Sequence, residues 1–291
     1  MNQATSNVTA IAARLYMDRP SGSLFHYTSL RGFLGIITEG ELQITDARYL
    51  NDASEMRVFV ERIKSAMSID TEFDEFTDDF HKEFGAWLDF RISDHGHSIF
   101  VACFTGNGNL LSQWRSYGDP GKNLSIGFNP DALQSAAHSQ GYILGRCIYD
   151  ATEQSKIAKE VLAAIKREAG SSKNVELKNV FTRAETNLLK IAILFKDQGF
   201  REEEEWRLVS PPVDNYVNFP IQFREGRTML TPFMKFVLPS RHDSRIDIEQ
   251  AFVGPTPHIN AAMSATLEFL SKLGVSPRRG LCYCQIPYRN T

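Results

Sequence analysis

The segment Glu202-Glu203-Glu204-Glu205-Trp206-Arg207 sets four consecutive carboxylates against an aromatic ring, an arginine and the apolar pair Leu208-Val209. A run of charges usually marks a solvated surface. This run leads directly into a strand-like segment, so its last members should lie at a strand edge. If the strand extends back through the run, alternation places Glu203, Glu205 and Arg207 on one face. We expect at least one of the carboxylates to pair with a neighbouring arginine.

Outward from this segment, strand and helix patterns are scattered along the chain with few regular βαβ units, which predicts an α+β fold. Strands are predicted at 23–27, 41–45, 98–104, 124–128, 142–149, 206–210, 216–224, 227–238, 248–253 and 281–286. Helices are predicted at 29–40, 53–91, 110–117, 131–138, 152–169, 175–196 and 259–273. We expect an N-terminal arm at 1–20 and a single α+β domain at 21–291, with helical insertions near 53–97 and 151–198.

The composition is that of an ordinary globular protein: 291 residues, 42% hydrophobic and 23% charged. The net charge of -3 gives no strong overall attraction to nucleic acid or to an anionic membrane. No apolar run approaches the roughly 20 residues of a membrane span, and the N-terminus lacks the features of a signal peptide. We therefore predict a cytoplasmic protein without a membrane partner.

The four cysteines predict no metal site. Cys103 and Cys147 lie in apolar, strand-like contexts that are typical of small buried side chains. Cys282 and Cys284 alternate on a predicted strand. Zinc bound by these two with His95 and His97 is conceivable, but nothing in the spacing fixes a tetrahedral geometry.

The stretch His26-Tyr27-Thr28-Ser29 stands where a short strand meets a predicted helix. Thr28 and Ser29 can cap that helix, and a helix N-terminus presents backbone N–H groups to a ribose or phosphate. A structural histidine followed by a cap explains the same pattern.

The loop Arg48-Tyr49-Leu50-Asn51-Asp52 follows the second predicted strand. Asn51 and Asp52 can cap the next helix, and the forked guanidinium of Arg48 suits a phosphate. The two interpretations are compatible.

The stretch Ser112-Gln113-Trp114-Arg115-Ser116-Tyr117 places two aromatic rings three residues apart. Trp114 fits core packing. Tyr117 precedes Gly118 at the predicted helix end, where its ring can stack on a planar ligand.

Two other kinds of site are disfavoured. The stretch from Gly118 to Asn123 contains Gly-Lys, but Ser116 and Asn123 occupy the positions where a phosphate-binding loop needs Gly and Ser or Thr. No Gly-x-Ser-x-Gly elbow is present, and no cysteine lies in an electropositive loop, so a serine or cysteine hydrolase is disfavoured.

Taken in order, these motifs resemble a bacterial family called domain of unknown function 2971. That family is in turn similar to the ADP-ribosyltransferase superfamily, whose members carry a histidine, an aromatic residue and a late glutamate. The first segment also resembles DNA-targeting toxins of that superfamily. The resemblance covers nearly the whole chain and rests on His26-Tyr27-Thr28-Ser29, Phe33-Leu34-Gly35-Ile36, Gly40, Leu50-Asn51-Asp52 with Glu55, Cys103-Phe104, Gln113-Trp114 with Tyr117, Ile126-Gly127-Phe128, Glu203 with Glu205-Trp206-Arg207, Gly254-Pro255 and Ile286-Pro287-Tyr288-Arg289.

The resemblance implies an ADP-ribosyltransferase-like split β-sheet core with an added helical layer, and NAD as the substrate. His26 would bind the adenosine-side ribose, and Tyr117 would stack on nicotinamide, with Tyr49 as the rival for that place. Glu205 would stabilise positive charge on the nicotinamide ribose, and Glu203 would orient the acceptor nucleophile. The NAD-binding set implied in this way is His26, Tyr27, Thr28, Ser29, Arg48, Tyr49, Asn51, Asp52, Gln113, Trp114, Tyr117 and Arg207.

Elementary chemistry agrees with those roles. Cleavage of the bond to nicotinamide develops an oxocarbenium-like ribose, so a fixed carboxylate lowers the barrier, and nicotinamide leaves as a neutral molecule. The hypothesis is an NAD-dependent ADP-ribosyltransferase, a toxin or antiphage effector that modifies a protein or nucleic acid and has an antitoxin or regulatory partner. The alternatives are an inactive nucleotide- or partner-sensing module, an NAD glycohydrolase, or a nuclease with Mg²⁺ on Asp52, Glu55 and the glutamates.

Overall fold

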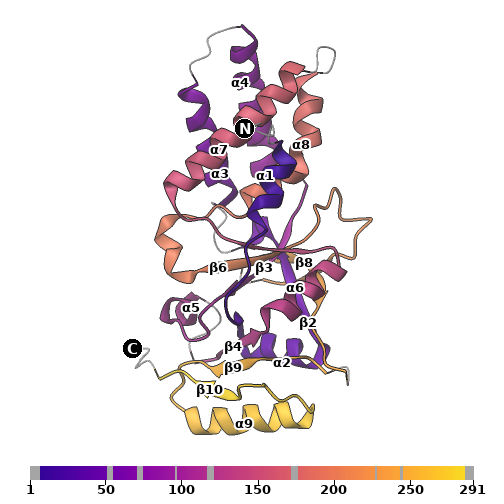
Figure 1. The fold of residues 1–291 in the computed structure, drawn as a ribbon. Coiled ribbons are helices and arrows are strands. Elements are labelled where there is room, and N and C mark those ends of the chain that lie inside the picture. The colour runs from indigo at the N-terminus through magenta and orange to yellow at the C-terminus, as the bar shows by residue number, and fades with distance from the viewer. Residues whose placement is uncertain are drawn as a thin grey trace.

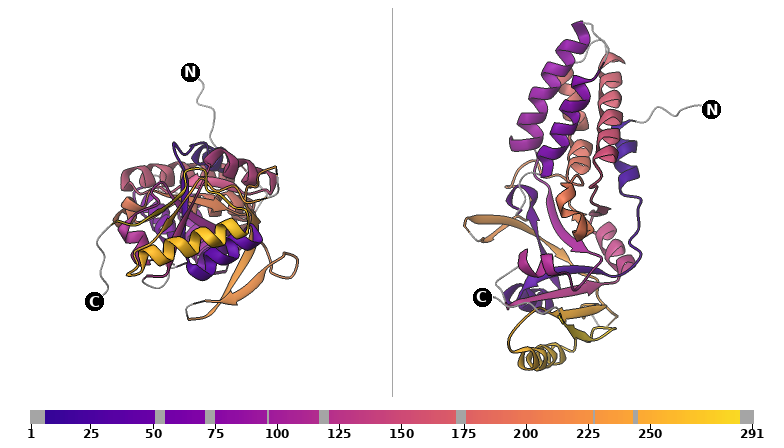
Figure 2. Two further views of the ribbon diagram at one scale, coloured as in Figure 1. Left: turned by 90° about the horizontal axis from the view of Figure 1, so that it is seen from below. Right: turned by 90° about the vertical axis from the view of Figure 1, so that its left-hand side faces the viewer.

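The structure, a computed structural model, describes residues 7–50, 55–70, 75–95, 97–116, 121–171, 176–226, 228–242 and 245–285. A helical layer lies at one end of an elongated molecule, the sheet crosses the middle, and helix α9 covers the other end (Figure 1). A hairpin of strands β7 and β8 projects from the body in the side view (Figure 2). Within the described residues, no helix is both long and apolar enough to cross a membrane.

The helices are α1 (Val8–Leu15), α2 (Leu30–Glu39), α3 (Glu55–Ser68), α4 (Glu75–Leu88), α5 (Leu111–Ser116), α6 (Pro130–Ser139), α7 (Ala151–Ser171), α8 (Leu177–Ala192) and α9 (Ile259–Lys272). Short helical turns are η1 (Ala47–Tyr49), η2 (Asp89–His95) and η3 (Gln198–Glu203). The strands are β1 (Leu24–Ser29), β2 (Glu41–Asp46), β3 (Phe100–Thr105), β4 (Asn123–Phe128), β5 (Ile143–Arg146), β6 (Glu205–Val209), β7 (Gln222–Glu225), β8 (Leu230–Val237), β9 (Gln250–Val253) and β10 (Leu281–Tyr283).

The sheet divides at strand β3. One edge of β3 pairs with β6 over five residue pairs, from Val101↔Val209 to Thr105↔Glu205. The other edge is shared: β1 pairs at Phe25↔Thr105, and β2 pairs near the opposite end of β3. From β1 the sheet continues through β4 and β9 to β10, and from β2 through β8 to β7. The predicted class, α+β with a split sheet and an added helical layer, is confirmed.

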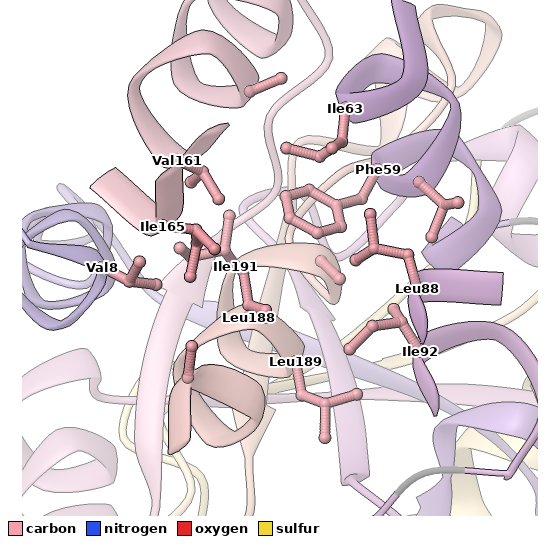
Figure 3. Close-up of a cluster of buried hydrophobic side chains, with 14 of the residues drawn as sticks. Val8, Phe59, Ile63, Leu88, Ile92, Val161, Ile165, Leu188, Leu189 and Ile191 are labelled. Atoms are coloured by element: carbon pink, nitrogen blue, oxygen red, sulfur yellow. The ribbon is translucent and has the colours of Figure 1, made fainter. Parts of the chain in front are cut away.

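The helical layer has a core of its own, formed by α1, α3, α7 and α8 with the end of α4 and the turn η2. Figure 3 shows these apolar side chains pointing toward one another between the helices. All of the labelled side chains are buried: Val8, Phe59, Ile63, Leu88, Ile92, Val161, Ile165, Leu188, Leu189 and Ile191. Val101 of β3 and Val209 of β6 belong to the same cluster, so this layer covers one face of the sheet's centre.

The second core lies on the opposite face of β3 and β6. Phe104 and Trp206 pair across these strands and pack with Phe33 of α2 and Leu133 of α6. Side chains alternate along a strand, so the residues before and after Phe104 and Trp206 face the helical layer. These residues are Cys103 and Thr105 of β3, and Glu205 and Arg207 of β6. This alternation positions the site described below.

The predicted boundaries of helix α2, at Ser29 and Gly40, are confirmed. The Ser29 hydroxyl accepts a hydrogen bond from the Gly32 N–H at 3.1 Å, as an N-cap does. Gly40 ends the helix with φ of 68°, a left-handed conformation that glycine adopts without a Cβ penalty.

The helical pattern at 53–91 forms two helices, α3 and α4. Two expectations were wrong in extent. The strand expected at 216–224 is confined to Gln222–Glu225, and the one expected at 142–149 to Ile143–Arg146. The strand also does not extend back through the acidic run: Glu203 ends turn η3, and Glu204 has φ of 42°, which reverses the chain before β6 begins.

Candidate functional site

Glu205 opens strand β6 and points between the sheet and the helical layer. Its side chain is 5% exposed. Its backbone N–H donates to the hydroxyl of Tyr149 at 2.9 Å, which fixes the start of the strand. The late carboxylate of the sequence is therefore an interior group, not part of a solvated surface.

Two cations hold this carboxylate. Arg207, two residues along the same face, donates from Nε to Glu205 Oε1 at 2.8 Å and from Nη2 to Oε2 at 3.2 Å. Lys196 Nζ donates to Glu205 Oε2 and to Glu203 Oε2. The third guanidinium nitrogen, Nη1, donates to the Ile193 carbonyl oxygen at 2.6 Å. Glu203, Glu205, Lys196 and Arg207, called the charge cluster below, balance two negative charges with two positive ones.

The charge cluster sets the protonation states of its members. Burial alone would raise the pKa of Glu205, but Arg207 and Lys196 outweigh it and lower that pKa to about 2. Burial alone would lower the pKa of Lys196, but Glu205 and Glu203 raise it above its ordinary value. Burial and the Glu205 carboxylate raise the pKa of the Cys103 thiol. At neutral pH Glu205 is therefore an anion and Lys196 a cation, beside the neutral thiol of Cys103.

A small cavity borders the charge cluster. Its lining includes Glu203, Glu205, Thr105, Tyr27 and Gln113. The Glu203 side chain reaches the cavity from turn η3, so both glutamates line it although the strand holds only one. The cavity volume is about 10 Å³, which is room for about one water molecule. An aromatic ring the size of nicotinamide does not fit there unless side chains move.

His26 lies on the other face of the sheet. Phe25, Thr105 and Glu205 are joined by strand pairing and share one face, so the residue after Phe25 points away from Glu205. The ring of His26 lies 5.7 Å from that of Phe104, and its Nδ1–H donates to the Cys103 carbonyl oxygen at 3.0 Å. Burial lowers the pKa of His26, which favours the neutral ring. His26 and Glu205 thus flank one strand, β3, from opposite faces.

Tyr27 and Trp114 form a packed pair. Their ring centroids are 4.6 Å apart, edge to face. The Tyr27 hydroxyl donates to the Asn107 carbonyl at 2.8 Å, and the Trp114 indole N–H donates to Asn109 at 2.9 Å. The core interpretation of Trp114 is confirmed, since the residue is 2% exposed. Gln113 is also buried, and its position at the cavity brings helix α5 to the same place as the glutamates.

Arg48 is occupied by protein groups. Its Nε and Nη2 donate to the fully buried carboxylate of Asp46, at 3.0 and 2.7 Å, and Nη2 also reaches Ser98 and Tyr216. Tyr49 is 39% exposed. Thr28 and Ser29 close strand β1 and open helix α2. Asn51, Asp52 and Tyr117 lie outside the described residues, as does the segment 286–289.

The sequence reasoning missed two members of the site, Lys196 and Tyr149. Lys196 had been assigned to the end of a helical pattern. The signal was available: a lysine that directly follows the apolar run Ile191–Phe195 must place its ammonium in or beside the core, where a carboxylate is required. Among the described residues, no three His, Cys, Asp or Glu side chains gather where they could share a metal ion.

The charge cluster, most of helix α5 and the cavity residues Gln113, Glu203 and Glu205 fall within one matching segment. Residues 113–208 match the model of a protein family of unknown function, DUF2971. The resemblance to that family is therefore confirmed for Gln113, Trp114 and the segment from Glu203 to Leu208. No curated protein matches the chain.

Among solved structures, the chain is similar to one titled "Thermus sp. 2.9 DarT in complex with ADP-ribosylated ssDNA". The identity is 9%, the alignment covers 94% of this chain and 100% of that chain, and the TM-score is 0.34. A TM-score this low does not establish a shared fold.

Proposed function

We propose that the chain is an ADP-ribosyltransferase that cleaves the bond between nicotinamide and ribose in NAD and transfers ADP-ribose to a macromolecule. The observation that carries the proposal is the pair of carboxylates, Glu203 and Glu205, that line one cavity with Gln113 and Tyr27. The pKa of Glu205, about 2, keeps that group ionised at any physiological pH.

The chemistry follows from that pair. As the carbon–nitrogen bond breaks, its electrons leave with nicotinamide, and positive charge develops on the ribose. A fixed carboxylate stabilises that charge without reorganising in the transition state. The acceptor nucleophile then bonds to the ribose carbon and loses its proton, for which Glu203 is the proposed base. The proposal keeps Thr28, Ser29, Tyr49, Asn51, Asp52, Tyr117 and Arg207 as further residues around NAD. It leaves out His26, which lies on the other face of β3, Arg48, which is bound to Asp46, and Trp114, which is packed in the core.

The biological part of the proposal is a cytoplasmic toxin or antiphage effector with an antitoxin or regulatory partner. Transfer to water in place of a macromolecule would make the same site an NAD glycohydrolase.

A second candidate function has an observation of its own. Both oxygens of Glu205 already accept hydrogen bonds from cations, and the cavity has room for about one water. A module that binds a nucleotide or a partner and performs no chemistry is consistent with both facts.

Nicotinamide release from NAD separates the two candidates, measured with the full chain in the presence of protein, single-stranded DNA and RNA as acceptors. The transferase predicts release that Glu203→Gln and Glu205→Gln each reduce by roughly a hundredfold or more. Glu202→Gln is the matched control, because Glu202 is an exposed carboxylate of the same run. NAD binding by calorimetry without release in any condition would favour the module. Neither binding nor release would refute the transferase and an NAD-binding module.

A further inference from the structure

The helical layer contains a larger cavity than the charge cluster does. It lies between the C-terminal end of α3, the start of α4 and the middle of α7. Figure 1 draws these helices in its upper part. Its volume is about 520 Å³, which falls within the range of about 300–1,000 Å³ that is usual for small-molecule sites. The site proposed for NAD lies at the sheet, so this cavity is a separate feature.

The floor of the cavity is apolar. Ile69 and Phe76 line it and are 58% and 39% exposed, so both present apolar surface to the cavity. Phe76 stacks on Phe80, which is fully buried, so its ring is supported from behind. Leu162 and Ala163 of α7 complete the apolar part. This surface suits an apolar ligand body.

The rim of the cavity is cationic. Lys159 and Lys166 are seven residues apart on α7, with Leu162 and Ala163 between them, so one helix face presents an ammonium on each side of the apolar patch. Arg167 adds a third cation to the lining. Asp70 is the one carboxylate among the described residues that line the cavity, and Lys166 donates to it at 2.8 Å. Among the described lining residues, three cationic side chains and one carboxylate therefore lie at the rim.

We propose that this cavity binds a small amphipathic anion: an apolar body over Phe76, Leu162 and Ala163, and a carboxylate, sulfonate or phosphate group facing Lys159. The floor supplies affinity through buried apolar area, and the cations select the charged end. The proposal does not depend on the function proposed for the sheet.

Two fluorescent probes test it on the full chain. Anilinonaphthalene sulfonate carries the anionic group, and N-phenylnaphthylamine has the same ring system without it. We expect the sulfonate to bind at one site per chain. Its dissociation constant should be lower than that of the neutral probe by roughly two- to fivefold or more. Equal affinity for the two probes, or no binding of the sulfonate, would overturn the proposal.

Three variants locate the binding. Ala163→Trp adds an indole at an exposed position in the lining and should weaken both probes at least about tenfold. Lys159→Ala should weaken the sulfonate roughly two- to fivefold and leave the neutral probe unchanged. Lys156→Ala, an exposed lysine of the same helix outside the lining, should change neither. If Ala163→Trp binds both probes like the wild type, the site lies elsewhere and the proposal fails.

Urea unfolding of each variant excludes probe binding to a partly unfolded chain. Competition then identifies the kind of anion. Displacement of the sulfonate probe by decanoate indicates a chain-like ligand, and displacement by naphthalene sulfonate indicates an aromatic one. Displacement by neither would count against the proposal.

Discussion

Replacing Lys196 with methionine should be among the most destabilising single changes on the sheet side of the helical layer. Lys196 is 6% exposed, and its ammonium serves Glu203 and Glu205 together. Methionine keeps most of the volume and removes the charge, so the cluster is left with two carboxylates and one guanidinium. Removal of one partner from a buried ion pair typically costs about 3–5 kcal/mol. That is a large part of the roughly 5–15 kcal/mol that stabilises a domain.

The cost should depend on pH in a defined direction. In the wild type, the pKa of Glu205 falls from 4.5 to about 2 on folding, so its stabilising contribution is present above pH 4.5 and is lost as the pH falls toward 2. A shift of that size corresponds to about 3 kcal/mol as an upper estimate. Without Lys196, the pKa of Glu205 rises, and protonation relieves the excess negative charge. The difference between variant and wild type should therefore shrink as the pH falls from 4.5 toward 2.

Urea unfolding followed by tryptophan fluorescence measures the effect at several pH values. Lys156→Met, on an exposed position of α7, is the control and should cost little. The double variant Lys196→Met/Glu203→Gln leaves the balanced pair Glu205 and Arg207, so it should be more stable than Lys196→Met alone. The reasoning is refuted if Lys196→Met costs less than about 1 kcal/mol at pH 7, or if the double variant recovers nothing.

Two backbone predictions use matched glycines. Gly35 and Gly40 both have open space where a Cβ would lie, but Gly40 has φ of 68°. In urea unfolding, Gly40→Ala should lower the free energy of unfolding by about 1–2 kcal/mol, and Gly35→Ala should raise it by about 0.4–1 kcal/mol. An equal effect at both positions would be inconsistent with the capping argument. A Cβ at Gly108 would lie 2.5 Å from the Phe25 ring and 2.8 Å from Phe252. Gly108→Ala should therefore cost about 1–3 kcal/mol of stability, whereas the control Gly22→Ala, with nothing within 4 Å, should cost little. Unchanged stability in Gly108→Ala would show that the Phe25 ring moves freely.

The sequence predicted the boundaries of those elements whose ends are fixed by residues close to them in the sequence. Helix α2 begins at the hydroxyl cap Ser29 and ends at the left-handed glycine Gly40, and both residue types can be recognised in the sequence. The prediction that at least one carboxylate of the acidic run pairs with Arg201 or Arg207 is also confirmed, because Glu205 and Arg207 are two residues apart on one strand face. These are interactions whose geometry depends on separations of a few residues.

Long-range geometry could not be predicted in the same way. Whether His26 faces Glu205 depends on the register of two strands against β3, and a shift of one residue would reverse the answer. Glu204 has a left-handed backbone conformation, which non-glycine residues seldom adopt. The acidic run therefore gave no sequence signal that the strand starts only at Glu205. Lys196 joins the site because the chain that follows α8 lies beside β6, where Arg207 donates to the Ile193 carbonyl oxygen. That contact links segments far apart in local structure.

The charge cluster also ranks its two glutamates for chemistry. Both oxygens of Glu205 accept from buried cations, and its guanidinium partner is itself fixed by the Ile193 carbonyl. Glu203 is held at one oxygen by Lys196 and is more exposed, 13% against 5%. A ribose that gains positive charge competes with these cations, and a single ammonium is easier to displace than a bidentate guanidinium. In the proposed transfer, Glu203 is therefore the carboxylate that can leave its cation and act as the base, whereas Glu205 stays fixed by Lys196 and Arg207 as the carboxylate that stabilises the ribose.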